Sequence, residues 1–413
     1  MRVVADFHLH SKYSRATSER LSLRGMAEAA KAKGVTLLGT GDFTHPQYFD
    51  ELERGLRLHD SGFYEHGGTL FVVSGEVSTV WSVGGKAKKV HLILLVPSLD
   101  VAAQINDVLS KRGHLAADGR PTFGMSAAEL VEVVMGIADD CEVIPAHAWT
   151  PWFSAFGSKS GFDSLKECFE DQAKRIHAIE TGLSSDPPMN WRLSALDSIT
   201  LVSNSDSHSP EKVGREANVF EFEEKGFSYR SLLSAIRAKD RRRFLATIEF
   251  YPEEGKYHFD GHRLCGVSLP PRKALACGNI CPVCRRPLTI GVLHRVEELA
   301  DRPEGFVPPN AIPFARRIPL NEILEKAVGS GRKAEEARSL LLQAFGNELA
   351  VLEGDRKRIE EVAGERVAEG IARAREGRVR LAPGYDGVYG EIDIFAEPAQ
   401  GTPTLQRSLQ EFL

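Results

Sequence analysis

The chain has 413 residues, of which 42% are hydrophobic and 26% are charged, and its formal net charge is −5. This length predicts one large domain with one or two smaller ones, and the acidic balance excludes a uniformly basic nucleic-acid binder. The sequence contains neither an apolar run of the ~18 residues that a membrane span needs nor a signal peptide, so we expect a cytoplasmic protein without a membrane partner.

Residues 1–250 alternate short apolar runs with helical patterns, which predicts an α/β barrel or a doubly wound sheet. The expected strands are residues 35–38, 70–73, 91–95, 143–145, 176–179 and 200–202. The expected helices are residues 22–33, 126–138 and 229–239. In the first helix, Ser22 is the predicted N-cap and Gly34 lies just beyond the last turn.

The composition changes after Tyr251. Residues 251–300 hold a cluster of cysteines and are expected to form a zinc-binding module. Residues 301–385 begin with a segment dense in Pro and Gly and continue with apolar residues at helical spacing, which predicts a helical C-terminal region. Residues 386–413 are expected to form a tail.

Metal-ligand residues recur at the ends of the predicted strands. His8 and His10 lie two residues apart on the first strand, so both side chains point to one face and can chelate the same ion. Further His, Asp and Glu residues follow later apolar runs: Asp42, Glu76, His147, Glu180, Asp206 and His208. His91 is the exception, because it lies at the start of its run. The carboxyl ends of barrel strands meet at one mouth, and unpaired charges are costly to bury, so we predict a metal cluster there.

Several of these segments resemble motifs of the PHP (polymerase and histidinol phosphatase) superfamily. They are Asp6-x-His8-x-His10-Ser11, Thr40-Gly41-Asp42, Ser74-Gly75-Glu76, His147 and Ser205-Asp206-Ser207-His208. The resemblance implies a distorted (β/α)7 barrel with two or three divalent ions. It implies His8, His10, Glu76 and Asp206 as ligands of one ion and as the catalytic set. Glu76 would bridge to a second ion held by His91 and His147, and Asp42 and His208 would hold a third.

The sequence departs from the PHP pattern at two places. Gly41-Asp42 stands where the family often has Asp-His, so a carboxylate replaces an imidazole at the third ion. Arg15 stands where many members carry an acidic residue. Two ions about 3.5–4 Å apart can activate a water and stabilise the attacking and leaving oxygens of phosphoryl transfer. The abundance of imidazole ligands favours Zn²⁺ or Mn²⁺ over Mg²⁺.

The cysteine cluster predicts a structural zinc site. Cys281-Pro282-Val283-Cys284 is a CxxC motif, and Cys265 and Cys277 precede it closely. In a reducing compartment such a cluster indicates a metal site rather than disulfides. A redox CxxC is disfavoured because no thioredoxin-like βαβ pattern surrounds it. We expect Cys277 to supply the fourth ligand, with His262 as the alternative.

Further segments, most of them outside the barrel, resemble the endonuclease Q family. They are residues 257–262, the cysteine cluster and residues 289–300, together with residues 180–186 and 385–391. The resemblance implies a DNA repair endonuclease that cuts on the 5′ side of deaminated bases (uracil, hypoxanthine, xanthine) and abasic sites. The alternatives are a PHP phosphatase acting on a small phosphate ester and an adaptor with a degenerate barrel. The zinc module and basic runs disfavour the phosphatase, and the intact ligand set disfavours the adaptor.

Candidate DNA contacts are of two kinds, and each has a structural alternative. The first kind is basic runs, which would contact phosphates or form solvated helix faces: Arg237, Lys239, Arg241, Arg242 and Arg243, and then Arg373, Arg375, Arg378 and Arg380. The second kind is the aromatic residues Trp149, Trp152 and Phe153 after His147. They would stack on an extruded base or pack the mouth of the barrel.

The tail sequence Gln406-x-x-Leu409-x-x-Phe412-Leu413 resembles the peptide with which repair proteins dock on a sliding clamp (PCNA). One helical turn would place Leu409 and Phe412 on the same face, so both could enter an apolar pocket. The alternative is an ordinary frayed terminus. The two resemblances therefore imply damaged DNA as one partner and a clamp as a second.

Overall fold

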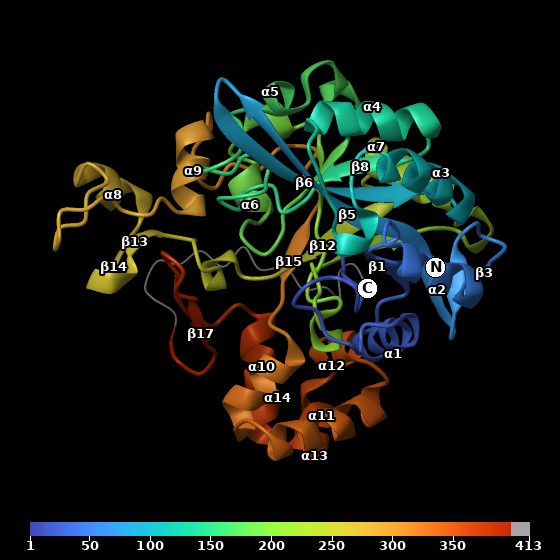
Figure 1. The fold of residues 1–413 in the computed structure, drawn as a ribbon. Coiled ribbons are helices and arrows are strands. Elements are labelled where there is room, and N and C mark those ends of the chain that lie inside the picture. The colour runs from blue at the N-terminus through green and yellow to red at the C-terminus, as the bar shows by residue number, and fades with distance from the viewer. Residues whose placement is uncertain (398–413) are drawn as a thin grey trace.

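The computed structural model describes residues 1–397. The predicted clamp motif, with Gln406, Leu409, Phe412 and Leu413, lies outside the described residues. Figure 1 shows an α/β body with a small module projecting from one side and a bundle of helices packed against another. No helix within residues 1–397 has both the length and the apolar character needed to cross a bilayer.

The body is a distorted barrel, which confirms the predicted α/β class. Its strands are β1 (Arg2–Asp6), β2 (Leu37–Gly39), β5 (Thr69–Val83), β6 (Lys86–Val96), β8 (Glu142–Pro145), β9 (Ala178–Glu180), β10 (Thr200–Val202), β11 (Ala217–Glu221) and β12 (Phe244–Glu249). Strands β1, β2 and β5 are parallel neighbours, and β9 pairs in parallel with β10. Strands β6 and β11 run antiparallel to their neighbours. The barrel is distorted in this sense, because a regular (β/α) barrel has parallel strands only.

Short strands extend the sheet at its edges: β3 (Arg57–Leu58), β4 (Tyr64–His66), β7 (Thr122–Phe123) and β15 (Phe314–Arg316). Strand β15 pairs in parallel with β12. It comes from the segment that the sequence assigned to the helical C-terminal region. The first part of that segment therefore belongs to the barrel sheet.

The antiparallel course of β6 explains the unusual position of His91. Strands β5 and β6 form one long hairpin that turns at Gly84 and Gly85, whose φ angles are +57° and +76°. Within the hairpin His91 pairs with Ser78, two residues beyond Glu76. A ligand early in an antiparallel strand reaches the same end of the barrel as ligands late in parallel strands. The hydrophobic periodicity of the sequence does not indicate that β6 runs antiparallel to its neighbours.

Helices cover the outside of the sheet: α1 (Leu23–Lys33), α2 (Pro46–Gly55), α3 (Leu99–Ser110), α4 (Ala127–Ile137), α5 (Leu165–Phe169), α6 (Pro187–Asn190) and α7 (Tyr229–Arg237). The predicted caps of α1 are confirmed. The Ser22 side chain accepts a hydrogen bond from the backbone N–H of Gly25, and Gly34 is left-handed with φ +86°. Such caps satisfy backbone groups that a helix end leaves without partners.

The projecting module contains β13 (Asp260–His262), β14 (Val267–Leu269), α8 (Pro271–Ala276) and α9 (Val292–Leu299). Its own apolar cluster contains only three buried residues, Ala274, Cys281 and Leu288. So few buried apolar residues contribute little folding free energy, and modules of this size usually need a metal or disulfides.

The C-terminal region consists of α10 (Leu320–Val328), α11 (Arg332–Phe345), α12 (Glu348–Leu352), α13 (Arg356–Ala363) and α14 (Glu365–Arg375), followed by the hairpin β16 (Arg380–Ala382) and β17 (Glu391–Asp393). Leu320, Ile323 and Leu324 belong to its buried apolar core. Lys33 on α1 forms a buried ion pair with Glu348 on α12, with 2.7 Å between Nζ and Oε2. The pair fixes this region against the barrel.

Candidate metal centre

Glu76 lies at the centre of the predicted ligand set and faces two groups of side chains. Its Oε2 is 3.5 Å from Nε2 of His8 and 3.2 Å from Nε2 of His10. Its Oε1 is 2.8 Å from Nδ1 of His91 and 3.2 Å from Nε2 of His147. Each oxygen therefore belongs to a different group, which is the arrangement of a carboxylate that bridges two ions.

Asp206 completes the first group. Its Oδ1 is 3.6 Å from Nε2 of His8 and 3.3 Å from Nε2 of His10. The ligand atoms of His8, His10, Glu76 and Asp206 all lie within 4.8 Å of one another, as do those of Glu76, His91 and His147. The structure thus brings together the six residues that the resemblance assigned to the first two ions.

Three atoms of this cluster are buried without a hydrogen-bond partner among the residues that the structure describes. They are Nε2 of His8, Nε2 of His10 and Oδ1 of Asp206. A buried polar atom without a partner costs free energy, and these three converge on one point. A divalent cation at that point would satisfy all of them, so the side chains present fit a metal.

The other ring nitrogens of His8 and His10 are held by carboxylates. Nδ1 of His8 lies 3.0 and 3.1 Å from the two oxygens of Glu180, and Nδ1 of His10 lies 3.0 Å from Oδ1 of Asp42. Such carboxylate–histidine pairs fix the tautomer and orientation of a metal-binding imidazole. The sequence placed Glu180 at a strand end but did not identify this role.

The residues predicted to bind a third ion are arranged differently from those of the first two sites. Asp42 is fully buried, and its Oδ2 accepts hydrogen bonds from the backbone N–H and the hydroxyl of Ser11, at 2.6 and 2.7 Å, and from the hydroxyl of Ser14 at 2.9 Å. His208 directs Nδ1 to the backbone carbonyl of Asp206 at 2.9 Å. Within residues 1–397, Asp42 and His208 belong to no group of three or more ligands. The oxygens of Asp42 are occupied in orienting His10 and the loop from Ser11 to Ser14.

The charges of the cluster stabilise one another. Burial opposes ionisation of Glu76, but its contacts with His91, Arg120 and His8 outweigh burial and hold its pKa well below the usual range. Burial lowers the pKa of His91 to about 4, despite the neighbouring Glu76. His91 is therefore a neutral imidazole near pH 7, which is the form that binds metals.

The backbone at the centre is also unusual. Asp42, His147 and Asp206 have φ angles of +41°, +31° and +45°, in the left-handed region that favours glycine. A non-glycine residue there costs of order 1 kcal/mol, and such residues cluster at functional sites. Three of them around one ligand cluster support its assignment as the functional site.

Arg120 is part of the centre although the sequence analysis did not single it out. Its Nη1 lies 2.9 Å from Oε2 of Glu76, and 30% of its side chain is exposed. Its pKa is raised, chiefly by the negative charge of Glu76. Arg120 lies just before β7 outside any recognisable motif, so no pattern in the sequence indicated it.

The aromatic residues after His147 have different surroundings. Trp149 is buried, donates from Nε1 to Oδ1 of Asn190 at 2.8 Å and stacks on Phe156, so it packs in the core. Phe153 packs against the ring of His91, with 4.6 Å between ring centroids. Trp152 is 43% exposed. Of the three predicted stacking residues, Trp152 has the most surface to offer to a base.

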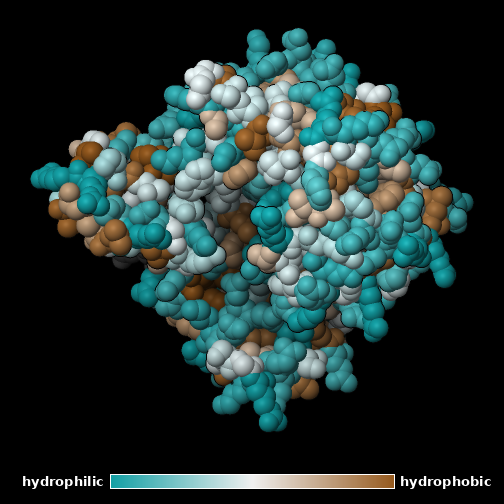
Figure 2. Space-filling model, viewed as in Figure 1, coloured by the Kyte–Doolittle hydropathy of each residue, from teal (hydrophilic) through white to brown (hydrophobic). Residues whose placement is uncertain are grey.

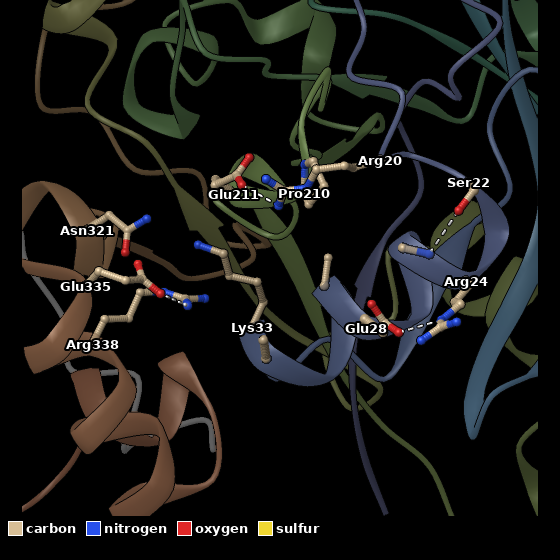
Figure 3. Close-up of a pocket in the computed structure, with 13 residues that line it drawn as sticks. Arg20, Ser22, Arg24, Glu28, Lys33, Pro210, Glu211, Asn321, Glu335 and Arg338 are labelled. Carbon is tan, nitrogen blue, oxygen red and sulfur yellow. Dashed lines mark hydrogen bonds and ion pairs between the residues drawn. The ribbon is translucent and has the colours of Figure 1, made fainter. Parts of the chain in front are cut away.

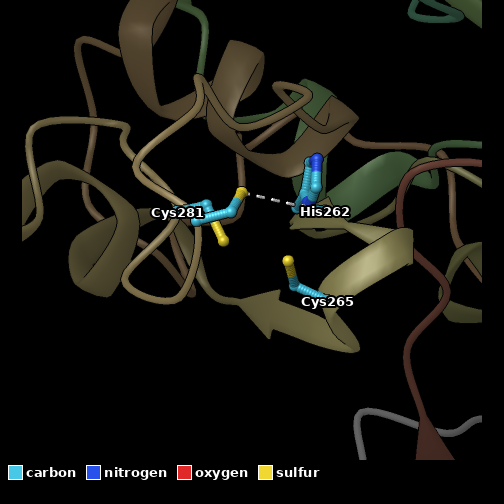
Figure 4. Close-up of side chains that lie close together, drawn as sticks. His262, Cys265 and Cys281 are labelled. Carbon is cyan, nitrogen blue, oxygen red and sulfur yellow. Dashed lines mark hydrogen bonds between the residues drawn. The ribbon is translucent and has the colours of Figure 1, made fainter.

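The cysteine site differs in one ligand from the expected set. His262, Cys265, Cys281 and Cys284 have ligand atoms within 4.8 Å of one another (Figure 4). Cys277 is outside this group, because it caps the C-terminal end of α8 and is exposed. The hairpin β13–β14 instead brings His262 to the site, where Nδ1 lies 3.7 Å from Sγ of Cys284. One imidazole and three thiolates are a common set for structural zinc.

Several side chains of the predicted basic runs contact other parts of the protein. Arg373 and Arg375 donate to the backbone carbonyls of Ile394 and Leu352, at 2.7 and 2.8 Å. Arg378 and Arg380 pair with carboxylates. In the first run, Nε of Arg237 lies 2.7 Å from Glu142, and Lys239 donates to the carbonyl of Asp197. These contacts favour a structural role for the six residues named here, whereas Arg241, Arg242 and Arg243 of the first run are exposed.

A surface cavity of about 600 Å³ lies between α1 and the C-terminal helices (Figure 3). It is lined by several cations, but these have acidic neighbours. Arg20 lies 2.5 Å from Glu211, and Arg24 lies 2.8 Å from Glu28. An anionic ligand would have to displace these carboxylates. The cavity is therefore a weaker candidate than the ligand cluster around Glu76.

Comparison with known proteins identifies the family. A family model described as PHP-associated matches residues 191–240. The uncharacterized protein YqxK of Bacillus subtilis is 31% identical over 408 residues, which are 95% of this chain and 99% of YqxK. The crystal structure of the lesion-specific endonuclease PfuEndoQ from Pyrococcus furiosus is similar at a TM-score of 0.84, with 32% identity and 95% of each chain covered.

A second solved structure is equally similar. It is endonuclease Q in complex with a 27-mer duplex substrate that has an abasic lesion at the active site. Its TM-score is 0.84 at 31% identity, and the match covers 96% of this chain and 99% of that one. Similarity over nearly the full length of both proteins includes the barrel, the projecting module and the C-terminal helices. The chain therefore belongs to the endonuclease Q family, which places it among the metal-dependent endonucleases with a PHP barrel.

Proposed function

We propose that this enzyme hydrolyses the phosphodiester on the 5′ side of deaminated bases (uracil, hypoxanthine and xanthine) and of abasic sites in DNA. The observation that carries the proposal is Glu76, whose two oxygens face two separate groups of metal ligands. The duplex with an abasic lesion that endonuclease Q binds supports the substrate class.

We assign His8, His10, Glu76 and Asp206 to one divalent ion and Glu76, His91 and His147 to a second. When bound, two such ions would supply an activated water and would offset negative charge on the phosphate. Four of the six ligands are imidazoles, which favours Zn²⁺ or Mn²⁺ over Mg²⁺. Asp42 and Glu180 keep His10 and His8 oriented, and Asp42 with His208 would hold a third ion only after rearrangement of the Ser11 contacts.

Arg120 would act on the substrate. Its guanidinium is half-buried beside Glu76 and retains exposed surface at the cluster. A cation fixed there would bind a non-bridging oxygen of the scissile phosphate and stabilise the charge that develops on it. Trp152, which is exposed in the loop after His147, would stack on an extruded base.

The proposal is tested with labelled duplexes that each contain a single deoxyuridine, deoxyinosine, deoxyxanthosine or abasic site, incubated with Mn²⁺, Mg²⁺ or Zn²⁺. We expect one nick 5′ to the lesion, with a 3′-hydroxyl and a 5′-phosphate, and no cut in the undamaged duplex. Intact damaged duplexes together with release of inorganic phosphate from small esters would establish the phosphatase alternative instead.

We also propose that the tail docks on a sliding clamp. The support is the sequence Gln406-x-x-Leu409-x-x-Phe412-Leu413. Binding of the full-length protein to a purified clamp should fall at least tenfold in the variant Leu409→Ala/Phe412→Ala. Equal binding of the two proteins would remove the clamp from the set of partners.

A further inference from the structure

Behind the metal ligands of the barrel lies a set of fully buried polar side chains. Asn204 follows β10, Asn218 lies in β11 and Glu180 ends β9, and none of the three has exposed surface. They contribute nothing to the largely hydrophilic face that Figure 2 shows, so bulk water does not compete for their hydrogen bonds. Because a buried polar group without a partner costs free energy, each of them needs a partner inside the protein.

The contacts of Asn204 leave one possible orientation of its amide. The backbone N–H of Phe7 points at one end of the side chain at 2.9 Å, and a backbone N–H can only donate. That end is therefore the oxygen Oδ1, which also accepts from Nδ2 of Asn218 at 3.0 Å. The other end is then the nitrogen Nδ2, which lies 2.9 Å from Oε1 of Glu180. Asn204 thus presents a donor, and not an acceptor, to Glu180.

Asn218 is oriented in the same way and holds Asn204 in place. Its Oδ1 accepts from the backbone N–H of Ser203 at 2.9 Å, so its Nδ2 faces the backbone carbonyls of Ala5 and Ser203, at 3.2 and 2.7 Å. Backbone groups of β1 and of the segment after β10 therefore set the direction of both amides. If the amide of Asn204 turned over, the N–H of Phe7 would face a second donor and lose its partner.

The carboxylate of Glu180 receives hydrogen bonds from three sides. Oε1 accepts from Nδ2 of Asn204, and Oε2 accepts from the backbone N–H of His147 at 2.7 Å. Nδ1 of His8 lies 3.0 Å from Oε1 and 3.1 Å from Oε2. The donors of Asn204 and His147 fix the plane of the carboxylate, which then requires Nδ1 of His8 to be a donor. Nε2 of His8 is left to face the proposed ion.

Asn204 also lies on the segment that carries another metal ligand. Asp206 follows two residues later, with φ +45° in the left-handed region. Between them, Ser205 donates its backbone N–H to Oδ1 of Asp6 at 3.1 Å, which holds this segment against β1. Asn204 is therefore linked to ligands of the first proposed ion by two routes, through Glu180 and through the chain itself.

We propose that Asn204 is a positioning residue of the metal centre. By donating to Oε1 of Glu180, it keeps the carboxylate turned toward Nδ1 of His8 and the backbone N–H of His147. It thereby keeps Nε2 of His8 available to a divalent ion. Outer hydrogen bonds of this kind fix the tautomer and the orientation of metal-binding imidazoles. The inference rests on the proposed function, because it assigns Asn204 a role in the same metal-dependent reaction.

The test reverses the direction of the hydrogen bond between residues 204 and 180. Asn204→Asp keeps the shape of the side chain and the acceptor for Phe7, but it places an oxygen against Oε1 of Glu180. Glu180→Gln, with its amide oxygen kept toward the N–H of His147, places a donor against Nδ2 of Asn204. The double variant Asn204→Asp/Glu180→Gln again pairs one donor with one acceptor and keeps the net charge of the wild type.

Binding of Mn²⁺ to the full-length protein is measured from the electron paramagnetic resonance signal of free Mn²⁺, so the measurement needs no DNA. Each single variant should bind Mn²⁺ about 10- to 100-fold more weakly than the wild type. The double variant should recover to within about threefold of the wild type, because the two changes compensate at one contact. In nicking assays the loss should appear mainly in the Mn²⁺ concentration needed for half-maximal rate.

Two further variants separate positioning from stability. Asn190→Asp changes another fully buried asparagine, whose side chain bonds Trp149, Ser185 and Asp186, so it should lower the melting temperature and leave Mn²⁺ binding unchanged. Asn204→Ala/Glu180→Gln should show no recovery, because alanine offers no acceptor. If Asn204→Asp does not fold, Asn204→Ala takes its place, since it also lacks the donor and should bind Mn²⁺ at least about tenfold more weakly.

Two outcomes overturn the inference. One is Mn²⁺ binding at the wild-type level by a folded variant at residue 204. The other is a double variant Asn204→Asp/Glu180→Gln whose loss equals the two single losses combined, because residue 204 would then support only the fold. In both cases, nicking of lesion DNA by the wild type leaves the proposed function intact. If the wild type neither binds Mn²⁺ in the barrel nor nicks lesion DNA, the proposed function and the inference fail together.

Discussion

Nδ1 of His8 lies 3.0 Å from Oε1 of Glu180, which leaves Nε2 of His8 as the nitrogen that faces Glu76. Glu180 also accepts from the backbone N–H of His147 at 2.7 Å, so one buried carboxylate orients a ligand of each proposed ion. We therefore expect Glu180 to act through the two histidines, as a positioning residue.

The substitution Glu180→Gln should weaken metal binding about 10- to 100-fold, which is the usual cost of losing an outer carboxylate. Nicking activity should recover in part at high metal concentration, because the ligands themselves remain. The measurement is activity against free Mn²⁺ or Zn²⁺ concentration. Glu221→Gln, at an exposed carboxylate on β11, is the matched control. A drop in activity that no metal concentration restores would contradict a positioning role.

The double substitution His8→Ala/His10→Ala should remove the ion of the first ligand group and leave the structural zinc in place. Both rings contribute an unpartnered Nε2 to the first ligand group, and no other imidazole belongs to that group within the described residues. Elemental analysis of the purified protein measures the metal content. Wild-type metal content in this variant would remove the two histidines from the ligand set.

Zinc in the module should depend on His262 and not on Cys277. The geometry places His262 with Cys265, Cys281 and Cys284, whereas Cys277 ends α8 on the surface. We expect His262→Ala and Cys281→Ser to lose zinc and to melt at a lower temperature, because metal binding is part of the folding free energy of such a module. Cys277→Ser should keep both its zinc and its melting temperature. The reverse result would restore the ligand set expected from the sequence.

Arg120 should contribute to the chemical step. Replacing it by Gln should slow single-turnover nicking about 10²-fold, the typical cost of losing one group that stabilises developing charge. Lys at this position should restore part of the rate, because it keeps the positive charge but loses the planar donor geometry. Metal content serves as the second readout. If Arg120→Gln loses its barrel ions, Arg120 supports Glu76 instead of the substrate.

Stability should fall as pH rises from about 5 to about 8, through Glu216 and Glu249. Both carboxyls are fully buried: Glu216 immediately precedes β11, and Glu249 ends β12, the antiparallel neighbour of β11. Burial raises the pKa of Glu249 to about 8, so the folded protein holds a proton that the unfolded chain releases above its ordinary pKa of 4.5. The native state binds more protons than the unfolded chain in this window, so the free energy of unfolding falls as pH rises. For one group it falls by at most about 1.4 kcal/mol per pH unit.

The variant Glu249→Gln should have a flatter profile of melting temperature against pH and a higher melting temperature at pH 8. It removes the titrating proton while keeping the size of the side chain. Glu221→Gln is again the exposed control. An unchanged slope in Glu249→Gln would show that this carboxyl does not hold the proton.

The sequence by itself determined the features that depend on neighbouring residues. The spacing of His8 and His10 predicted that both rings meet, and in the structure both follow β1 and belong to one ligand group. Ser22 and Gly34 cap α1 as predicted. Most strand-end ligands were found in the same way, since an apolar run followed by a His, Asp or Glu is a local pattern. The endonuclease Q family was indicated by motifs for the same reason.

Only the tertiary structure decided the features that depend on pairing between distant segments. His91 reaches the centre because β6 is antiparallel to β5, and Arg120 meets Glu76 across 44 residues of chain. His262, the alternative fourth ligand, lies with Cys265, Cys281 and Cys284, whereas Cys277 does not. Arg373 and Arg380 are occupied because Ile394 and Asp393, at the end of strand β17, return to them. Such contacts bring residues together through packing and strand direction, which residue type and spacing along the chain do not specify.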